Sequence, residues 1–417
     1  MKTGIKRALS VVLLLAMVAA YVAFLARALA MQEGPEKNGA FLREDRQYDV
    51  LLFGSSHMVN GIYPMQLWKD YGITAYNLSG HGSSLATSYW TMRLAVEYRK
   101  PRAAVLDVLF AQSNTKSMDI SLAHELLDPF PLSKRKIEAI RDLYEADSQR
   151  AELLFPLDVY HNRWKDLDGA MVRRGLTGET DLSPEKGAQA RIDVVPTEAG
   201  EKIPRTQCME EKTVALEYVE KFVVFCLEND IVPVLTYLPC EISPEWQESC
   251  NAALALGESL GAEIVDMQHM DLLNDETDWY DAGGHLNPSG AKKTTRCLGD
   301  FLRDRLSLPD HRQEDLTAAD WGGDYTRYLA YLGGRFGELE TLPQLLSLGT
   351  IDDFAVELWV GPGADLDLLT LQQLRQMGEK TRLYAGKEAS VVSVKVSGPD
   401  GRVLAEKRFS MALRENS

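Results

Sequence analysis

The stretch "VLLFGSSHMVNG" (residues 50–61) joins four apolar residues to a glycine, two serines and a histidine. A short apolar run that ends at glycine is typical of a buried strand. In a doubly wound α/β sheet, active sites form beyond the carboxyl ends of the strands. The stretch therefore predicts a strand that delivers Ser55 or Ser56 to such an edge.

The same alternation of apolar runs and helical patterns continues along the chain. Strands are predicted at residues 48–54, 73–80, 103–110, 231–239 and 262–267. Apolar strands separated by helices indicate a parallel sheet covered on both faces. The predicted fold class is a three-layer α/β/α, doubly wound parallel sheet.

This sheet domain is expected to span residues 48–307, with a helical insertion at about 111–207. An insertion of that length in an α/β domain usually forms a lid or a substrate subdomain. Residues 308–332 are assigned to a linker, because the stretch is polar at first and then helical in character. A small C-terminal α+β domain is predicted at 333–417, with a hairpin turn at Gly398–Gly401.

The N-terminus predicts a membrane helix. Lys2, Lys6 and Arg7 precede an uncharged run of 19 residues, 8–26, which at about 1.5 Å per residue roughly spans a bilayer core. The basic flank favours an anchor at 1–31 with a stem at 32–47, and places the rest of the chain outside the cytoplasm. Cleavage of a signal peptide near Ala30 is the alternative.

Charge and cysteine content narrow the function. A net charge of −16 argues against a nucleic-acid partner. The five cysteines form no metal-type pair and no second histidine lies at ligand spacing, so neither a metal nor another cofactor is predicted. Cys240 and Cys250 are ten residues apart, and a bridge between them stays open.

A partner for the serine lies far along the chain, in "DWYDAGGHLNPSGAKK" (278–293). A serine hydroxyl becomes a nucleophile when a histidine takes its proton and a carboxylate orients that histidine. His285 and Asp281 follow the last predicted strand. Reactive residues that follow the first predicted strand and reactive residues that follow the last one are thus expected at the same edge of the sheet.

Three blocks carry a family resemblance: "FGSSH" (53–57), "YNLSGHGSSL" (76–85) and "YDAGGHLNPSGAKKTT" (280–295). In that order they resemble the SGNH/GDSL-type hydrolases. The likeness is greatest to the membrane-anchored branch with alginate O-acetyltransferases and the D-alanyl-transfer proteins of teichoic acid modification. Members of that branch work beside membrane-bound O-acyltransferases.

The resemblance implies roles for individual residues. Ser56 takes the nucleophile position, His285 that of the base and Asp281 that of the orienting acid. The N–H groups of Ser56 and Gly82 would form the oxyanion hole. The implied activity is transfer or hydrolysis of O-acyl groups, acetyl above all, on a cell-envelope polysaccharide.

Two departures from the family pattern leave alternatives open. The family's acid precedes its histidine by three positions, whereas Asp281 precedes His285 by four, so Asp278 competes for the role. The asparagine of the third block has no clear match, and Gln112 or Asn114 are its substitutes. One missing oxyanion donor costs about 3–4 kcal/mol of transition-state stabilisation. A non-catalytic scaffold that binds glycan or assembles an envelope acyltransferase complex is therefore the alternative function.

Within the insertion, "VYHNRW" (159–164) is unusual. Arg163 and Trp164 are candidate substrate-binding residues, because arginine holds carboxylates and both side chains stack on rings. An arginine–aromatic packing contact inside the insertion is the alternative interpretation.

The predicted anchor yields a test of topology. A reporter that is active only in the cytoplasm, fused after Ser417, should be inactive in cells, because the basic flank keeps the N-terminus inside. A reporter active only after export, fused at the same position, is the matched control. An active cytoplasmic reporter would reverse the predicted orientation.

Overall fold

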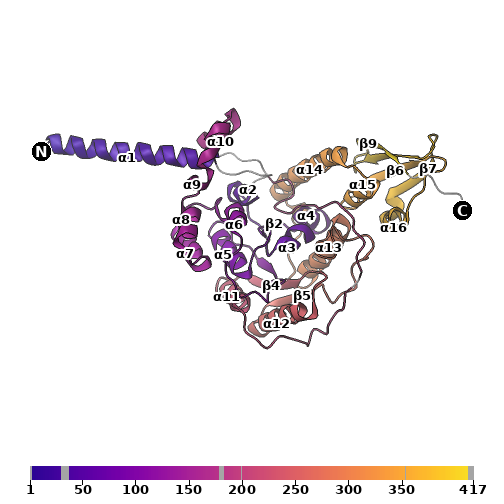
Figure 1. Cartoon of the computed structure of the whole chain (residues 1–417), viewed down its shortest axis with the longest axis horizontal. Helices are drawn as coiled ribbons and strands as arrows, with labels where there is room; N and C mark the ends of the chain where they lie inside the picture. Colours follow the sequence, from indigo (N-terminus) through magenta and orange to yellow (C-terminus); the bar gives the residue numbers. More distant parts are fainter. Residues whose placement is uncertain (1, 30–36, 178–182, 199, 353, 412–417) are drawn as a thin grey trace. The chain divides into compact units, whose positions relative to one another are not determined.

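The computed structural model describes residues 2–29, 37–177, 183–198, 200–352 and 354–411 (Figure 1). The chain divides into two compact units. Residues 1–45 and 117–183 form one of them, called here the helical unit. Residues 46–116 and 184–417 form the other, the sheet unit.

The sheet unit contains a five-stranded parallel sheet in the order β2-β1-β3-β4-β5, which confirms the five predicted strands. The strands are β1 (Val50–Phe53), β2 (Ala75–Asn77), β3 (Ala103–Asp107), β4 (Val232–Tyr237) and β5 (Glu263–Asp266). All four residues of β1 are buried. A strand buried on both faces reads as a continuous apolar run, which is why these segments were visible in the sequence.

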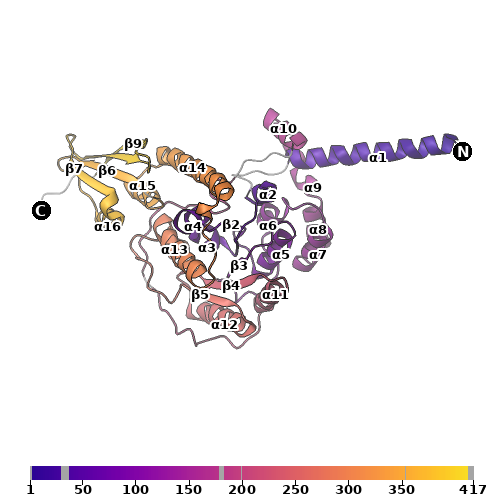
Figure 2. The same ribbon diagram turned by 180° about the vertical axis from the view of Figure 1, so that it is seen from behind.

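Helices connect these strands and pack against them. They are α3 (Ser56–Gly61), α4 (Pro64–Tyr71), α5 (Leu85–Val96), α11 (Val214–Glu228), α12 (Pro244–Leu260) and α13 (Pro288–Asp304). Val50 and Leu52 share a buried cluster with Leu298 of α13. Side chains alternate between the faces of a strand, and Phe53 meets Phe222 of α11 with ring centroids 6.0 Å apart. Figures 1 and 2 show α4 beside α13 and α11 beside α12.

Residues that are typical of helix ends lie where these helices begin or end. Pro64 begins α4, and Gly72 closes it in the left-handed region at φ 68°. Ser243 caps α12 by accepting from the Trp246 N–H. Asn287 caps α13 by accepting from the N–H groups of Ser289 and Gly290. The α13 cap fixes the residues just before the helix, and His285 is among them.

The C-terminal part of the sheet unit has a second sheet in the order β7-β6-β8-β9. Its elements are α14 (Asp315–Glu338), α15 (Leu342–Gly349), β6 (Ala355–Val360), α16 (Leu368–Met377), β7 (Thr381–Ala385), β8 (Val391–Ser397) and β9 (Val403–Ser410), with short 3₁₀ turns η2 (His311–Gln313) and η3 (Gly378–Lys380). The predicted turn at 398–401 joins β8 to β9, and the Gly401 N–H donates to the Gly398 carbonyl at 2.9 Å.

The range expected to be a linker, 308–332, instead holds η2 and most of α14. Trp321 of α14 is buried. Asp324, one turn further, is also buried and is paired with Arg46 and Lys186, each at 2.7 Å. The helical character expected in the later part of this range is thus present, and ion pairs fix the helix to both pieces of the sheet unit.

The helical unit contains α1 (Lys2–Leu29), α2 (Lys37–Arg43), α6 (Ile120–Leu127), α7 (Lys134–Leu143), α8 (Asp147–Leu154), α9 (Leu157–Tyr160), η1 (His161–Asp166) and α10 (Gly169–Thr177). The part of the predicted insertion that belongs to this unit is 117–183, narrower than 111–207. Helix α2 lies in the expected stem. Within α1, residues Gly4–Ala26 are long and apolar enough to cross a membrane or to act as a signal sequence.

All five cysteines are free thiols, so the bridge considered between Cys240 and Cys250 is not formed. Both are buried. The Cys250 thiol lies 3.4 Å from the Leu109 carbonyl, to which it donates. Burial raises the pKa of Cys250 and of Cys226 far above the ordinary thiol value. These two are core side chains rather than reactive thiols.

Candidate active site

The turn after β1 separates the roles of the two serines. Gly54 has φ 148°, and a Cβ there would lie 2.9 Å from the Cβ of Asp107, at the end of β3. Ser55 is the N-cap of α3, and its Oγ accepts from the His57 N–H. Ser56 is the first residue of α3. The close approach to β3 requires glycine at position 54 and fixes where Ser56 emerges.

Three side chains form a continuous hydrogen-bonded chain. Ser56 Oγ lies 2.7 Å from His285 Nε2. On the other side of the ring, His285 Nδ1 lies 2.6 Å from Asp281 Oδ2. The structure thus brings together three residues that the sequence singled out. With Nδ1 donating to Asp281, Nε2 of the neutral ring is free to accept the Ser56 proton.

The loop geometry explains how Asp281 reaches a histidine four positions away. Asp281 Oδ1 accepts from the backbone N–H groups of Gly284, at 2.9 Å, and of His285, at 2.7 Å. Gly283 sits at φ 85°, where a Cβ would lie 2.5 Å from the Glu241 side chain. A glycine in the left-handed region allows a tight turn. This turn accommodates the one additional residue between Asp281 and His285.

These contacts also set the charge of Asp281. Partial burial on its own would raise the pKa of Asp281. The hydrogen bonds from the His285 ring and from the two backbone N–H groups outweigh burial, so the pKa is lowered overall. The group is a carboxylate at neutral pH, as an orienting acid must be.

Asp278 has a different environment. Its side chain is fully buried and is paired with Lys293 of α13, with Nζ 2.5 Å from Oδ2. The same oxygen accepts from the Asn274 N–H at 2.7 Å, and Thr277 Oγ1 donates to the other. Asp278 therefore holds the loop to α13, whereas Asp281 contacts the histidine.

The oxyanion donors are only partly defined. Gly82 lies in the left-handed region at φ 62°, and among the described residues neither its N–H nor that of Ser56 donates to a backbone carbonyl. Asn114 Oδ1 accepts from the Val214 N–H at 3.2 Å. Gln112 Oε1 is buried without a partner in the described part of the chain. Neither substitute forms a hydrogen bond to Ser56.

His57 is a part of this site that the sequence reasoning left unassigned. Its ring stacks on that of His285, with centroids 4.6 Å apart and planes inclined by 24°. Its Nδ1 lies 3.3 Å from Ser55 Oγ, and it forms a hydrogen bond with the Gly284 backbone. His57 thus connects the serine turn to the histidine loop. The feature of the sequence that could have identified His57 is its position directly after Ser56.

The electrostatics of His57 follow from its surroundings. Burial is the main reason that its pKa is lowered to about 3, and the nearby His285 lowers it further. Asp281 and the Gly284 carbonyl oppose this shift without cancelling it. His57 is therefore neutral over the whole physiological range and presents an uncharged ring to His285.

A cavity of about 280 Å³ lies next to the acid–base loop. Tyr280, the residue before Asp281, lines it, and the Arg191 guanidinium lies 5.6 Å from the centre of the Tyr280 ring. Gln189, Tyr331 and Arg335 also line the cavity. Gln189 Oε1 is 3.0 Å from Nε2 of His81, the neighbour of Gly82. Ser56, Asp281 and His285 do not line this cavity, but Tyr280 and Gln189 join it to the neighbours of Asp281 and Gly82.

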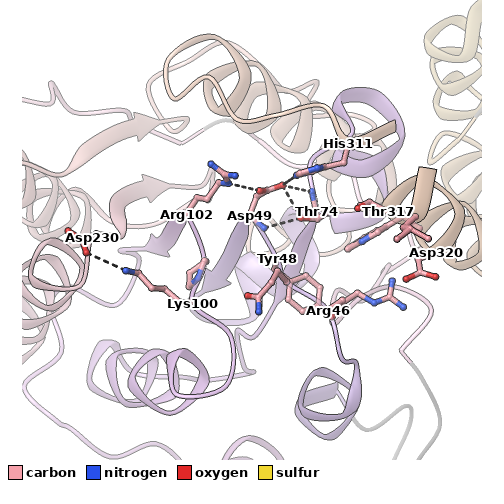
Figure 3. Close-up of a pocket in the computed structure, with 14 residues that line it drawn as sticks. Arg46, Tyr48, Asp49, Thr74, Lys100, Arg102, Asp230, His311, Thr317 and Asp320 are labelled. Carbon is pink, nitrogen blue, oxygen red and sulfur yellow. Dashed lines mark hydrogen bonds and ion pairs between the residues drawn. The ribbon is translucent and has the colours of Figure 1, made fainter. Parts of the chain in front are cut away.

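A larger cavity, of about 520 Å³, lies at the amino ends of β1 and β3, opposite the serine turn (Figure 3). Ser56, Asp281 and His285 do not line it. Its central carboxylate, Asp49, is held by Thr74, Arg102 and His311. These contacts connect β1 to β2 and to η2. The arrangement stabilises the fold, and its carboxylate already has its partners.

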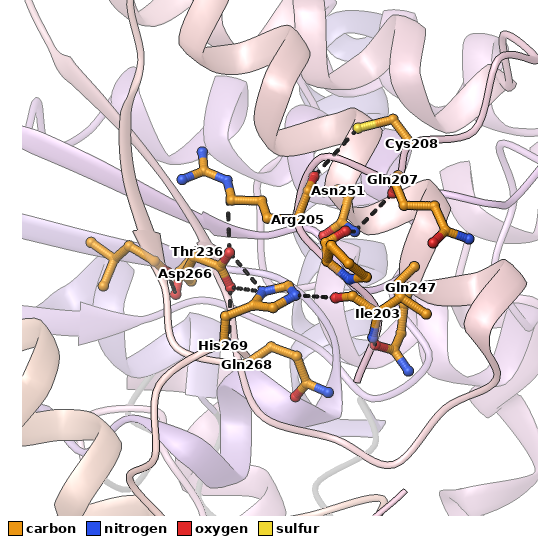
Figure 4. Close-up of polar contacts among 12 residues, drawn as sticks. Ile203, Arg205, Gln207, Cys208, Thr236, Gln247, Asn251, Asp266, Gln268 and His269 are labelled. Atoms are coloured by element: carbon orange, nitrogen blue, oxygen red, sulfur yellow. Dashed lines mark hydrogen bonds and ion pairs between the residues drawn. The ribbon is translucent and has the colours of Figure 1, made fainter. Parts of the chain in front are cut away.

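Figure 4 shows a second histidine–aspartate pair, formed by Asp266 at the end of β5 and His269. His269 Nδ1 lies 2.8 Å from Asp266 Oδ2, as in the serine site. Its Nε2, however, is 2.8 Å from the Ile203 carbonyl rather than from a hydroxyl. This pair therefore binds a loop and has no nucleophile. Among the described residues, no group of three or more His, Cys, Asp or Glu side chains could hold a metal ion.

Arg163 and Trp164 belong to η1 in the helical unit. Arg163 Nη1 donates to the Leu29 carbonyl at the end of α1, at 2.8 Å, which is a different contact from the arginine–aromatic one expected inside the insertion. Trp164 is 62% exposed. A role for either residue in substrate binding stays a prediction.

Comparisons with known proteins add little. No protein-family model and no curated protein matches the chain. A Bacteroides fragilis crystal structure described as a "putative acylhydrolase" aligns with a TM-score of 0.33 and 12% identity, over 65% of this chain and 96% of that one. Such a likeness is too low to support a conclusion, so any functional assignment depends on the geometry of the site.

The half-buried, neutral His57 predicts a specific pH dependence of stability. Between its folded pKa of about 3 and the ordinary value of 6.5, the unfolded chain binds a proton that the folded chain does not. The free energy of unfolding should therefore fall as pH decreases from 6.5 towards 3. His57→Phe keeps a stacking ring without a titrating group, so urea unfolding should show a weaker acid loss in this variant.

His124 provides the matched control. It is also buried, but its two nitrogens face Asp128 and Glu152, and its pKa is raised instead. His124→Phe should therefore not reduce the acid loss. The same pH dependence in wild type and His57→Phe would show that His57 is not held neutral.

Proposed function

We propose that the chain is a serine acyl-transfer enzyme of the SGNH type. The observation that carries the proposal is the hydrogen-bonded chain from Asp281 through His285 to Ser56. An oriented imidazole in contact with a hydroxyl at the carboxyl edge of a parallel sheet is the arrangement that activates serine for attack on a carbonyl. The strand order β2-β1-β3-β4-β5 supports a doubly wound, SGNH-like layering.

The first half-reaction forms an acyl-enzyme. Ser56 Oγ attacks the carbonyl carbon of the acyl ester while His285 Nε2 takes the hydroxyl proton. Asp281 stabilises the resulting imidazolium, and the N–H groups of Ser56 and Gly82 donate to the oxyanion. Collapse of the tetrahedral intermediate breaks the bond to the alcohol oxygen, which receives the proton from His285.

The second half-reaction releases the acyl group. Water, or a hydroxyl group of an acceptor, gives its proton to His285 and attacks the acyl carbon, and Ser56 leaves with the proton returned. Water makes the enzyme an esterase, and a sugar hydroxyl makes it a transferase. His57 stays uncharged near neutral pH and stacks on the His285 ring, so we assign it the role of holding that ring against Ser56.

The substrate class is proposed from the cavity next to the loop that carries Asp281 and His285. Tyr280 and Tyr331 offer flat apolar faces, and Arg191 and Arg335 offer donors, which together suit a sugar ring and its substituents. The apolar helix α1 supports action at a membrane, outside the cytoplasm. We therefore favour O-acyl groups, acetyl above all, of a cell-envelope polysaccharide, handled beside a membrane-bound O-acyltransferase.

Serine labelling tests the enzyme assignment against the scaffold alternative. A serine-reactive phosphonate should label the wild-type chain and should not label Ser56→Ala, because only an activated hydroxyl attacks phosphorus. Ser55→Ala removes the cap of α3 but leaves the Ser56–His285 contact, so labelling should persist. No labelling of the folded wild type, or equal labelling in Ser56→Ala, would favour the scaffold.

Two aspartate variants test the orienting acid. Asp281→Asn should lower turnover of an aryl ester by about 10⁴, because the neutral amide favours the wrong histidine tautomer. Asp278→Asn is the matched control: it breaks the buried pair with Lys293 and should reduce thermal stability with a much smaller change in turnover of the folded enzyme. A larger loss of turnover in Asp278→Asn would transfer the role to that residue.

A further inference from the structure

Helix α1 leaves most of its apolar surface uncovered in the helical unit. Leu9, Val12, Leu13 and Leu15 are each more than half exposed. The apolar stretch Gly4–Ala26 spans 23 residues, or about 35 Å of helix. A helix of this kind is stable when lipid replaces water around it. Only its last turns, near Leu25, Ala28 and Leu29, have protein around them.

The protein around those turns is the segment 155–177, which contains α9, η1 and α10. In α10, a Cβ on Gly175 would lie 2.6 Å from the Phe24 ring and 2.8 Å from the Ala28 Cβ, so the two helices are in close contact. Tyr160 and Met171 share a buried cluster with Leu29. Figures 1 and 2 both show α10 beside this end of α1. The segment therefore lies at the level where the apolar stretch ends.

The same segment directs large apolar side chains outward. Five of them are at least two-fifths exposed: Phe155, Val159, Trp164, Leu167 and Leu176. Trp164 and Leu176 are 62% and 71% exposed. Exposed tryptophan and leucine in water are costly, but they are characteristic of segments placed at the boundary between lipid and water.

The charged residues of segment 155–177 also fit a place at the boundary between lipid and water. The segment carries Arg163, Lys165, Arg173 and Arg174 against three aspartates, in a chain whose net charge is −16. One of those aspartates, Asp168, caps α10 by accepting from the Met171 N–H at 2.8 Å. Long basic side chains beside aromatic ones are typical of the headgroup layer, where their charges stay hydrated near lipid phosphates.

We propose that residues 155–177 are a membrane-interface segment, seated in the lipid headgroup layer around the end of α1. The occupant of its exposed apolar surface is the bilayer in which α1 is embedded, because that surface continues the bare apolar surface of α1. The proposal goes beyond the acyl-transfer function and does not depend on it. It gives Trp164 a lipid contact in place of a contact with substrate.

Quenching of tryptophan fluorescence tests the proposal on the full chain. Of the seven tryptophans, Trp164 is the one in the helical unit. In vesicles of phosphatidylethanolamine and phosphatidylglycerol, lipids brominated near the headgroup end of the acyl chain should quench part of the wild-type emission. Trp164→Phe should lose that quenched part. Lipids brominated near the chain ends should quench it less.

A matched control is Trp359→Phe, which removes a half-buried tryptophan from β6 of the sheet unit and should keep the quenched part. Leu176→Glu should weaken the quenching, because it places a carboxylate at the lipid boundary. Equal quenching in wild type and Trp164→Phe would overturn the proposal. So would a Trp164 that is shielded from aqueous iodide yet not quenched by brominated lipid, since that result indicates a protein or glycan partner.

Discussion

The contact between Ser56 Oγ and His285 Nε2 joins residues 229 positions apart. Its length of 2.7 Å depends on how the rest of the sheet unit positions the two residues. Two conditions must be met for this contact. Strand β1 must be followed by a turn at Gly54, where the close approach of β3 requires glycine. The loop before α13 must also be held in place. The Asn287 cap and the buried pair of Asp278 with Lys293 supply that second condition. Neither group belongs to the hydrogen-bonded chain of Asp281, His285 and Ser56, yet each holds the loop that carries His285.

Much of this could be anticipated from the sequence, because buried parallel strands are continuous apolar runs and helix ends carry Pro, Ser, Asn and Gly at defined positions. The candidate triad followed from topology, which brings the carboxyl ends of all five strands to one edge. The choice between Asp281 and Asp278 did not follow. It depends on a left-handed Gly283 and on two backbone donors, and neither contact has a sequence signature.

Other elements escaped prediction for physical reasons that their residues show. Strand β7 is short, and four of its five residues are exposed, so it lacks the apolar alternation that marks a strand. The helical character of α14 was expected, but its packing was not, because Trp321 and the ion pairs of Asp324 lie in a polar stretch of sequence. The stacking of His57 on His285 could not be predicted, because stacking between two rings leaves no pattern in the spacing of residues.

The two units are each assembled from two separate pieces of the chain, and this has a consequence for the order of events during synthesis. Residues 46–116, with β1, β2 and β3, emerge before the second piece of the helical unit, 117–183, exists. The central strand β3 lacks its second neighbour until β4 has been synthesised, since β4 pairs with it from Val232 onward. Three of the five strands are then present, and one edge of β3 has no partner strand until the residues between Asp107 and Val232 have been added. Long-range pairing of this kind is slow and exposes strand edges to aggregation, so the chain is most prone to aggregate before β4 has been synthesised.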